Sequence, residues 1–364
     1  MRLAGCLRVE VAVACGLVAG GGALGVGAAH QLRSALLARR SPPQSSVAGP
    51  RPSALRARQD LSLEGGESAE SGPDVGAESA GTFLGMSDDL LLDRIRTQPV
   101  ARLKLNRGGS SLSFRVDFAD GSRAAWKPAQ TNTQTIPRKE VAAYRVNRLL
   151  GLNAVPPAAQ RSLSRDEVFG LLHPDSLAFL PRIRAETIVG PNGMISGQGS
   201  YWIPVIKDSA FDTPAGHAEM AEWLTQTGEI PFQHRAFAAQ VAIMVVFDFL
   251  IANPDRYSGG NMKTTADGGQ LFFMDNTMSF FLNEDGMERN RQLLSRTQRF
   301  SRSLHQALAR VDVATLRRLF HEPDGGEVLT EAEIRATVSR REFVERHVAA
   351  LIAQYGEQRV LCFP

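Results

Sequence analysis

Two carboxylates follow apolar segments of this sequence, at positions where a carboxylate could do chemistry. Asp255 ends an Asn-Pro-Asp turn directly after the apolar stretch Ala236–Ala252, and Asn261 comes six residues later. Asp275 follows the apolar run Leu271–Met274. Phosphoryl transfer needs a carboxylate that orients the acceptor hydroxyl, together with oxygen ligands for a divalent metal ion. The pattern makes Asp255 a candidate catalytic carboxylate, and Asp275 and Asn261 candidate metal ligands.

A simpler interpretation exists for each of these segments. The first could be the end of a buried helix, followed by an Asn-Pro turn and a glycine-rich loop. The second could be a turn that is capped by Asp275 and the asparagine after it. A carboxylate at the end of a buried strand is costly unless it is paired or bound to a metal, and this cost favours the functional interpretation.

Lys127 and Glu140 could complete such a site. Lys127 ends the apolar segment Ala124–Trp126, and Glu140 stands thirteen positions later, at the start of the next predicted helix. A lysine held by a sheet can pair with nucleotide phosphates as a point charge, and it needs a carboxylate to orient it. Taken singly, the two residues could also be a solvated strand end and a first-turn glutamate matched to the helix dipole.

A short glycine segment precedes the lysine. Gly108, Gly109 and Ser110 lie between two predicted strands. Glycines let backbone N–H groups approach phosphate oxygens closely, so the segment is a candidate phosphate-binding loop. An ordinary hairpin turn has the same composition, and these three residues alone favour the turn.

Apolar patterns predict the elements that must position these residues. Alternating or apolar runs with tight turns between them predict an antiparallel meander over Ala101–Leu105, Leu112–Phe118 and Ser122–Lys127. An amphipathic helix over Lys139–Leu150 follows and ends at Gly151.

The second half of the chain is richer in helix. Its predicted elements are a strand or extended connector over Ser200–Ile206, a strongly apolar helix over Ala236–Ala252, a buried strand over Leu271–Met274 and a terminal helix over Arg341–Tyr355. A small sheet followed by a larger helical part predicts an α+β fold with two lobes. We place the N-lobe over about 99–200 and the C-lobe over about 201–364.

Composition excludes several classes of protein. The chain has 364 residues and a formal net charge of +3, which is nearly neutral and gives no support for nucleic-acid binding through bulk charge. Its length suffices for one large or two ordinary domains with a sizeable core. Its three cysteines, Cys6, Cys15 and Cys362, exclude a disulfide scaffold and a cysteine-based zinc site.

The N-terminal part of the chain differs from the rest. No Phe, Trp or Tyr precedes Phe83, and because cores draw on aromatic side chains, residues 1–82 are not expected to contain one. Residues 1–29 contain an uncharged apolar run that is typical of a secretory signal or a membrane anchor, with a disordered Ala/Gly tail as the alternative. Residues 30–82 have the composition of a disordered linker. The folded domain is therefore expected over 83–364.

The N-terminal segment also predicts the location of the protein. A signal or anchor implies a protein that is attached to a membrane or exported, in the periplasm, at the cell surface or in a secretory lumen. Arginines on both sides of the apolar run leave the side of the membrane open.

The motifs, in this order, resemble the secretory-pathway atypical kinases. The matching segments are the glycine loop, Ala125-Trp126-Lys127-Pro128, Lys139–Leu150 with Val155-Pro156-Pro157, Asp248–Arg256, and Met274-Asp275-Asn276. That family contains the Golgi casein kinase, the proteoglycan xylose kinase and Four-jointed, and bacterial proteins related to HipA and to the phosphatidylinositol-kinase-like fold share its core. The resemblance covers about residues 100–285. It implies a bilobal atypical protein-kinase-like fold, with a small antiparallel-sheet N-lobe and a larger, mostly helical C-lobe.

The resemblance also implies roles for individual residues. Lys127 would contact the α and β phosphates of ATP, and Glu140 would pair with Lys127 or help to hold a metal ion. Asp255 would be the catalytic carboxylate, and Asp275 the chief ligand of Mn2+ or Mg2+. The segment Tyr201–Ile206, with Tyr201 and Ile203, would be the hinge that touches adenine. Asn261 lies one residue further from Asp255 than the usual kinase loop places its metal-binding asparagine.

Two departures from the animal members of that family matter. The chain has no cysteine between Cys15 and Cys362 and no Asn-x-Ser/Thr sequon. These absences favour a bacterial-type relative, or a domain that is not matured in an oxidising lumen. The region after Ser279 matches the animal members poorly, so their substrate-binding parts are not transferred to it.

The sequence thus predicts a metal-dependent kinase that moves the γ-phosphate of ATP to a hydroxyl group of a protein or a glycan. Three other functions stay open at this point. The chain could be a nucleotide-binding regulator without transfer activity, a lipid or small-molecule kinase on the same fold, or a tethered interaction domain with no nucleotide site.

Overall fold

The structure is a computed structural model that describes residues 81–282, 286–322 and 327–364. The signal or anchor predicted at 1–29, and all but the last two residues of the linker predicted at 30–82, lie outside the described residues. Within the described ranges, no helix is both long and apolar enough to cross a membrane.

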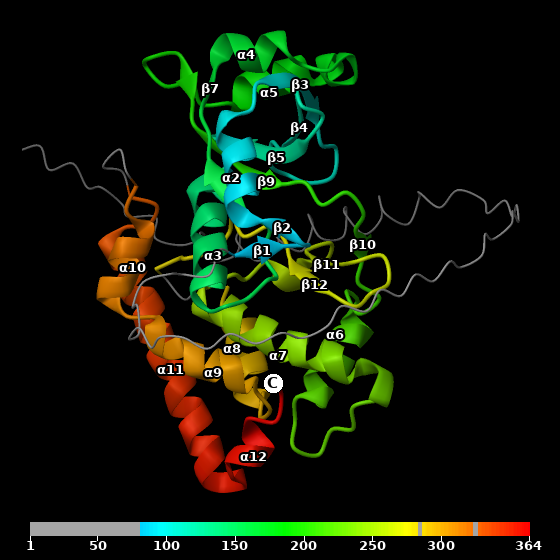
Figure 1. Ribbon diagram of the computed structural model, residues 1–364, viewed down its shortest axis with the longest axis vertical. Coiled ribbons are helices and arrows are strands. Elements are labelled where there is room, and N and C mark those ends of the chain that lie inside the picture. Colours follow the sequence, from blue (N-terminus) through cyan, green and yellow to red (C-terminus); the bar gives the residue numbers. More distant parts are fainter. Residues whose placement is uncertain (1–80, 283–285, 323–326) are drawn as a thin grey trace, which may run out of the picture. The chain divides into compact units, whose positions relative to one another are not determined.

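A five-stranded antiparallel sheet forms the centre of the N-lobe (Figure 1). Its strand order is β3-β4-β5-β9-β6. The strands are β3 (Val100–Leu105), β4 (Phe114–Phe118), β5 (Arg123–Pro128), β6 (Ala158–Gln160) and β9 (Gly197–Tyr201). Alternation in β4 buries Phe114, Val116 and Phe118 on one face. The predicted three-strand meander is confirmed, with boundaries within two residues.

Two helices pack against this sheet. Helix α2 (Asp88–Thr97) follows a hairpin of β1 (Thr82–Phe83) and β2 (Met86–Ser87), and it contacts β6 and β9. The approach is so close that a Cβ atom on Gly199 would lie 2.6 Å from the Ile95 Cγ2 atom. Helix α3 (Pro137–Leu149) contacts the same two strands. Pro137 stands at its start, where a missing N–H costs nothing, so the helix predicted at Lys139–Leu150 begins two residues earlier.

An insertion between β6 and β9 covers the free edge of β3. It contains β7 (Leu163–Ser164), α4 (Arg165–Gly170), η1 (Pro174–Phe179), α5 (Leu180–Glu186) and β8 (Met194–Ile195). The Leu103 N–H donates to the Leu171 carbonyl, and the Leu103 carbonyl accepts from the His173 N–H, at 2.8 and 2.7 Å. Figure 1 shows α4 and α5 beyond β3 and β4.

The C-lobe is mostly helical. Its helices are α6 (Pro214–Trp223), α7 (Arg235–Leu250), α8 (Glu288–Arg296), α9 (Arg302–Ala307), α10 (Val313–Phe320), α11 (Glu331–Tyr355) and α12 (Glu357–Val360), with short 3-10 turns η2 (Phe232–His234), η3 (Arg256–Ser258) and η4 (Leu308–Arg310). A three-stranded sheet joins β10 (Lys207–Asp208), β11 (Met262–Thr264) and β12 (Leu271–Phe273). The helix predicted at Ala236–Ala252 and the strand predicted at Leu271–Met274 are confirmed as α7 and β12.

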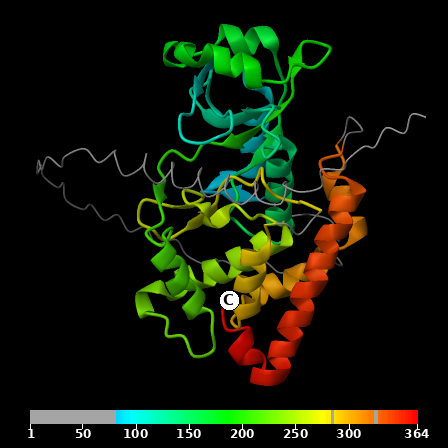
Figure 2. The same cartoon turned by 180° about the vertical axis from the view of Figure 1, so that it is seen from behind.

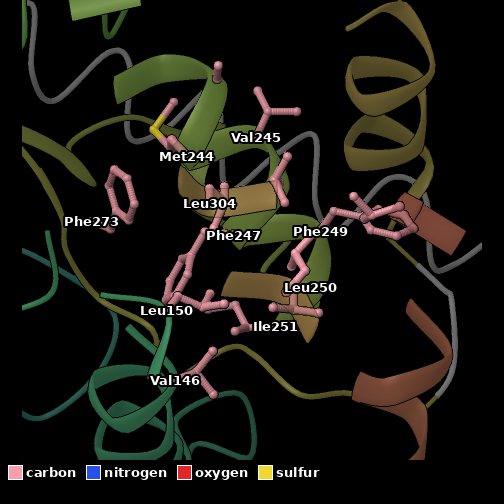
Figure 3. Close-up of a cluster of buried hydrophobic side chains, with 14 of the residues drawn as sticks. Val146, Leu150, Met244, Val245, Phe247, Phe249, Leu250, Ile251, Phe273 and Leu304 are labelled. Carbon is pink, nitrogen blue, oxygen red and sulfur yellow. The ribbon is translucent and has the colours of Figure 1, made fainter. Parts of the chain in front are cut away.

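One apolar core runs from the N-lobe helix α3 into the C-lobe. Figure 3 shows Val146 and Leu150 beside Phe247 and Ile251, and all four side chains are buried. Helix α7 is apolar on all sides, which is the pattern of a helix surrounded by other elements. The shared core therefore fixes α3 against α7.

Helix α11 is longer than the sequence analysis predicted. The expected helix over Arg341–Tyr355 is confirmed, but it begins at Glu331, and Figure 2 shows it extending along the C-lobe. Thr330 and Glu333 form a capping box at its start, each side chain bonding the other's backbone N–H. A Thr-x-x-Glu pattern is a readable signal for a helix start, and the sequence analysis did not use it.

Glu333 also ties α11 to α3. Its carboxylate accepts two hydrogen bonds from the Arg138 guanidinium, at 2.9 and 3.0 Å, and lies 3.6 Å from the Lys139 ammonium. Lys139 is 2% exposed, and its ammonium lies 4.0 Å from the centroid of the Phe281 ring. Burial lowers the pKa of Lys139 to about 8, although the charge of Glu333 opposes the shift.

A lowered lysine pKa makes stability depend on pH. Between the folded pKa of Lys139 and that of an unfolded lysine, the unfolded chain binds more protons, so the free energy of unfolding rises with pH. Between pH 7.5 and pH 9.5, we expect the free energy of unfolding of the wild-type chain to rise by about 1–2 kcal/mol relative to that of Lys139→Met. Urea unfolding at each pH measures this difference. The control is Lys207→Met, which removes an exposed lysine; an equal pH trend in both variants would contradict the assignment to Lys139.

Candidate active site

An ion pair joins two of the predicted site residues, one from each lobe. The Lys127 ammonium at the end of β5 donates to the Asp275 Oδ1 atom just beyond β12, at 2.5 Å. The Lys127 side chain is 10% exposed and that of Asp275 is 39% exposed. Lys127 is therefore not a solvated strand end, and the fold has brought together two residues that stand 148 positions apart.

Both members of the pair are charged near neutral pH. Burial acts to lower the pKa of Lys127, but the carboxylates of Asp275 and Glu140 raise it further than burial lowers it. Burial acts to raise the pKa of Asp275, but the Lys127 charge and hydrogen bond, with a further bond from the Thr277 hydroxyl, lower it overall.

Glu140 takes a different partner from the one predicted. Its Oε2 atom accepts the backbone N–H of Asn276 at 2.7 Å, and its Oε1 atom accepts the Asn276 side-chain amide at 3.2 Å. The expected Lys127–Glu140 pair is thus replaced by the Lys127–Asp275 pair, with Glu140 bound to the residue after Asp275. Glu140 is 5% exposed, and burial raises its pKa although the Lys127 charge opposes this.

Asp255 and Asn261 lie together in the loop between α7 and β11. The Asn261 side-chain amide donates to the Asp255 Oδ2 atom and to the Asp255 carbonyl, both at 2.9 Å. The Asp255 N–H in turn donates to the side chain of Asn253 at 3.0 Å. The loop 255–261 therefore accommodates the extra residue and still directs Asn261 toward the predicted catalytic carboxylate.

Arg256 is a residue of the site that the sequence analysis did not assign. Its guanidinium is fully buried and bonds both carboxylate oxygens of Asp248 on α7, at 3.0 to 3.2 Å. It also donates to the carbonyls of Asn261 and Met274 and to the Asn276 side chain. Arg256 thus connects α7, the loop 255–261 and the segment after β12. Asp248, one carboxylate in an apolar helix, was the signal for such a partner.

Two residues of the site have a left-handed backbone. Asp275 has φ +54° and Ala252, which precedes Asn253, has φ +50°. Non-glycine residues adopt this conformation only where the surroundings enforce it. The Asn253 amide donates to the Asn276 side chain at 3.2 Å, so hydrogen bonds hold both bends.

The glycine loop is anchored at its end. Gln130 is buried, and its side chain bonds both the N–H and the carbonyl of Leu112, at 2.7 and 3.0 Å, and the carbonyl of Pro128. The Ser110 carbonyl accepts from Arg182 on α5 at 2.8 Å. These bonds fix the end of the loop beside the strand that carries Lys127. Contact of Gly108, Gly109 and Ser110 with phosphates stays a prediction.

Tyr201 and Ile203 face an apolar cluster. The Tyr201 ring packs edge-on against Phe83, with 5.9 Å between ring centroids, and Ile203 is buried with Phe83, Leu91 and Phe272. A hinge role would therefore use the backbone of this segment, and its contact with adenine stays a prediction.

The donor set fits a kinase-type metal site. Within the described ranges, no group of three or more His, Cys, Asp or Glu side chains could hold a metal ion unaided. Mg2+-type ions in phosphoryl-transfer sites are bound by one or two carboxylates together with substrate phosphates and water. Asp275, Glu140 and the amide oxygen of Asn261 could supply the protein ligands of such an ion.

Comparison with known proteins gives a result for the fold alone. No protein-family model and no curated protein matches the sequence. Among solved structures, the Golgi casein kinase with Mn/ADP bound has a TM-score of 0.58 at 16% identity, over 75% of this chain and 78% of that one. Hydra Fam20 with sugar has a TM-score of 0.56 at 16% identity, over 74% of this chain and 90% of that one.

The chain has a Fam20-like atypical kinase fold. The predicted α+β, protein-kinase-like fold class is confirmed. In this Fam20-like fold, Lys127 and Glu140 belong to the N-lobe, and Asp255, Asn261 and Asp275 to the C-lobe. The roles of these residues, and a bacterial-type origin related to HipA, stay predictions.

Removal of the Asp248 carboxylate should destabilise the Fam20-like fold. In Asp248→Asn the buried Arg256 loses its only carboxylate partner among the described residues, and breaking a buried pair in this way costs about 3–5 kcal/mol of unfolding free energy. Urea unfolding of the full chain measures the loss.

The matched control is Asp208→Asn, which breaks an exposed pair with Lys263. Exposed ion pairs contribute little to the free energy of unfolding, so the unfolding free energy of this variant should be close to that of the wild type. Equal stability of Asp248→Asn and the wild type would contradict the scaffold role of Arg256.

Proposed function

We propose that this chain is a metal-dependent phosphotransferase that moves the γ-phosphate of ATP to a hydroxyl acceptor. The observation that carries the proposal is the Lys127–Asp275 ion pair, formed across the two lobes of a Fam20-like kinase fold. A lysine can bind phosphate oxygens as a point charge, and a nearby carboxylate can hold the metal ion that accompanies them.

The proposed nucleotide site uses charge that is already in place. Lys127 would contact the α and β phosphates, and the glycine loop would add backbone N–H groups. Asp275, with Glu140 and Asn261, would hold Mn2+ or Mg2+, which neutralises charge on the phosphates when it is bound. The Golgi casein kinase was solved with Mn/ADP bound, which supports a nucleotide and a divalent metal ion as the bound groups.

Asp255 would orient the acceptor hydroxyl and take its proton. Its Oδ2 atom is held by Asn261, whereas its Oδ1 atom has no hydrogen-bond partner among the described residues. One oxygen is thus fixed and the other is available to a hydroxyl group. Because phosphoryl transfer requires little covalent chemistry from the protein, positioning and electrostatics supply most of the catalysis.

The acceptor class and location are also proposed. The proposed acceptors are Ser/Thr side chains of a protein or hydroxyls of a glycan; hydra Fam20 was solved with sugar. The N-terminal segment 1–29 would attach the chain to a membrane or direct its export, which would place the folded domain, 83–364, in the periplasm, at the cell surface or in a secretory lumen. No nucleic-acid partner is proposed.

Removal of either carboxylate should abolish transfer. We expect Asp255→Asn and Asp275→Asn to lower phosphate transfer from labelled ATP by about 10²–10⁴-fold, because each removes a charge that transfer requires. The assay uses the full chain with Mn2+ or Mg2+ and offers a casein-like protein, a glycan or buffer alone. Chelation of the metal should give the same loss.

The control is Asp267→Asn, which makes the same change at an exposed aspartate in the turn between β11 and β12. Full transfer by Asp255→Asn would refute its assigned role. Metal-dependent thermal stabilisation by ATP without transfer to any acceptor would indicate a nucleotide-binding regulator. A chain that neither transfers phosphate nor binds ATP would show that the proposal is wrong.

A further inference from the structure

Three side chains that bond to one another contact the loop 255–261 from outside it. Asp212 precedes α6, His217 lies on α6, and Arg289 lies on α8. The His217 Nε2 atom lies 3.2 Å from Asp212 Oδ1, and Arg289 Nη2 lies 2.8 Å from His217 Nδ1. We call these three residues the loop clamp.

The partners of His217 determine which tautomer its neutral ring adopts. A guanidinium can only donate hydrogen bonds, so the Nδ1 atom of His217 must accept from Arg289. The Nε2 atom then carries the proton and donates it to Asp212. The side chains of His217 and Asp212 are 8% and 3% exposed. The hydrogen bond between His217 and Asp212 is therefore largely shielded from water, which strengthens it.

The clamp holds the loop at two places. Asp212 Oδ2 accepts the backbone N–H of Gly260 at 2.6 Å, immediately before Asn261. Arg289 Nη1 donates to the Tyr257 carbonyl at 3.3 Å, and its guanidinium lies 4.7 Å from the centroid of the Tyr257 ring. The segment between Arg256 and Asn261 is thus fixed at both ends.

Asp212 is suited to this role by its charge. Burial acts to raise its pKa, but the bonds from His217 and from the backbone N–H groups of Gly260 and Met262 lower it overall. The carboxylate is thus charged, and a charged acceptor binds N–H groups about twice as strongly as a neutral one. The N–H group of Gly260, which it binds at 2.6 Å, directly precedes Asn261.

The loop needs such an external constraint. Gly259 and Gly260 have φ values of +96° and +83°, which glycine permits but does not enforce. These two residues directly precede Asn261, whose amide holds Asp255 Oδ2 and whose carbonyl is bonded to Arg256. A shift at Gly260 would therefore change the direction of the Asp255 carboxylate.

We propose that Asp212, His217 and Arg289 are positioning residues that set the direction of Asp255 through the loop 255–261. The catalytic part of this inference rests on the proposed function. His217 and Arg289 act through the loop, and the proposed mechanism gives neither of them a contact with ATP.

The test uses two variants that disrupt the loop clamp, His217→Phe and Arg289→Met, and two that are expected to leave it intact, His217→Gln and Arg296→Met. His217→Phe removes both hydrogen bonds, whereas His217→Gln keeps one donor and one acceptor. Arg289→Met changes an exposed residue, so it tests the clamp with little risk to folding. Arg296→Met, an exposed arginine on the same helix, is the control. All four are made in the full chain.

Amide hydrogen exchange over residues 256–262 and steady-state kinetics are the two measurements. We expect His217→Phe and Arg289→Met to exchange faster in this segment and to lose up to about 10²-fold in kcat, with little change in the KM for ATP. His217→Gln and Arg296→Met should stay close to the wild type in both. A purely structural role of His217 would lower stability without this division between kcat and KM.

The two measurements separate the inference from the proposed function. Unchanged exchange in both His217→Phe and Arg289→Met would overturn the clamp, whatever the activity. Faster exchange with an unchanged kcat would overturn its role in positioning Asp255. A wild-type chain without transfer activity would overturn the proposed function alone, because the exchange comparison requires no substrate.

Discussion

A guanidinium with no exposed surface constrains much of this structure. A buried charge is tolerated only when it is paired and its donors are bonded, and Arg256 meets this requirement through Asp248, two backbone carbonyls and the Asn276 side chain. These groups belong to α7, to the loop after it and to the segment after β12. None of the three can move alone without leaving part of the charge unbonded.

Asn276 extends this constraint into the N-lobe. Its side chain accepts from Arg256, and its backbone and side-chain N–H groups donate to Glu140 on α3. A displacement of α3 would leave the buried Glu140 carboxylate without its hydrogen-bond donors. It would also disturb the apolar contacts of Val146 and Leu150 with α7. The distance between Lys127 and Asp275 is thus the outcome of both polar and apolar contacts between the lobes.

The sequence allowed most residues of the candidate site to be predicted, but not which residues they bond. Lys127, Glu140, Asp255 and Asp275 each begin or follow an apolar element, so local patterns could select them. The choice of Asp275 rather than Glu140 as the partner of Lys127 depends on how the two lobes pack against each other, which no local pattern contains. Arg256 was missed because its importance arises only when Asp248, eight residues earlier, turns inward to meet it.

Two capping boxes in the sequence mark helix starts that the sequence analysis did not predict. The Thr330–Glu333 capping box marks the true start of α11, and the Ser164–Glu167 capping box marks α4 in the N-lobe insertion. His217 offered no ligand spacing in the sequence. Its role depends on Arg289, which lies 72 positions away.

The insertion that covers β3 limits how an extended peptide could dock. Sheets often recruit peptides by adding them as a further strand at an open edge. Here Leu103 and Leu105 already bond to residues 171–176, and the opposite edge strand, β6, has only three residues. Strand addition at the β3 edge would require the insertion to detach first, and β6 offers only a short edge. Under the proposed function, an acceptor would therefore be recognised by side chains and loops rather than by backbone pairing at the β3 edge.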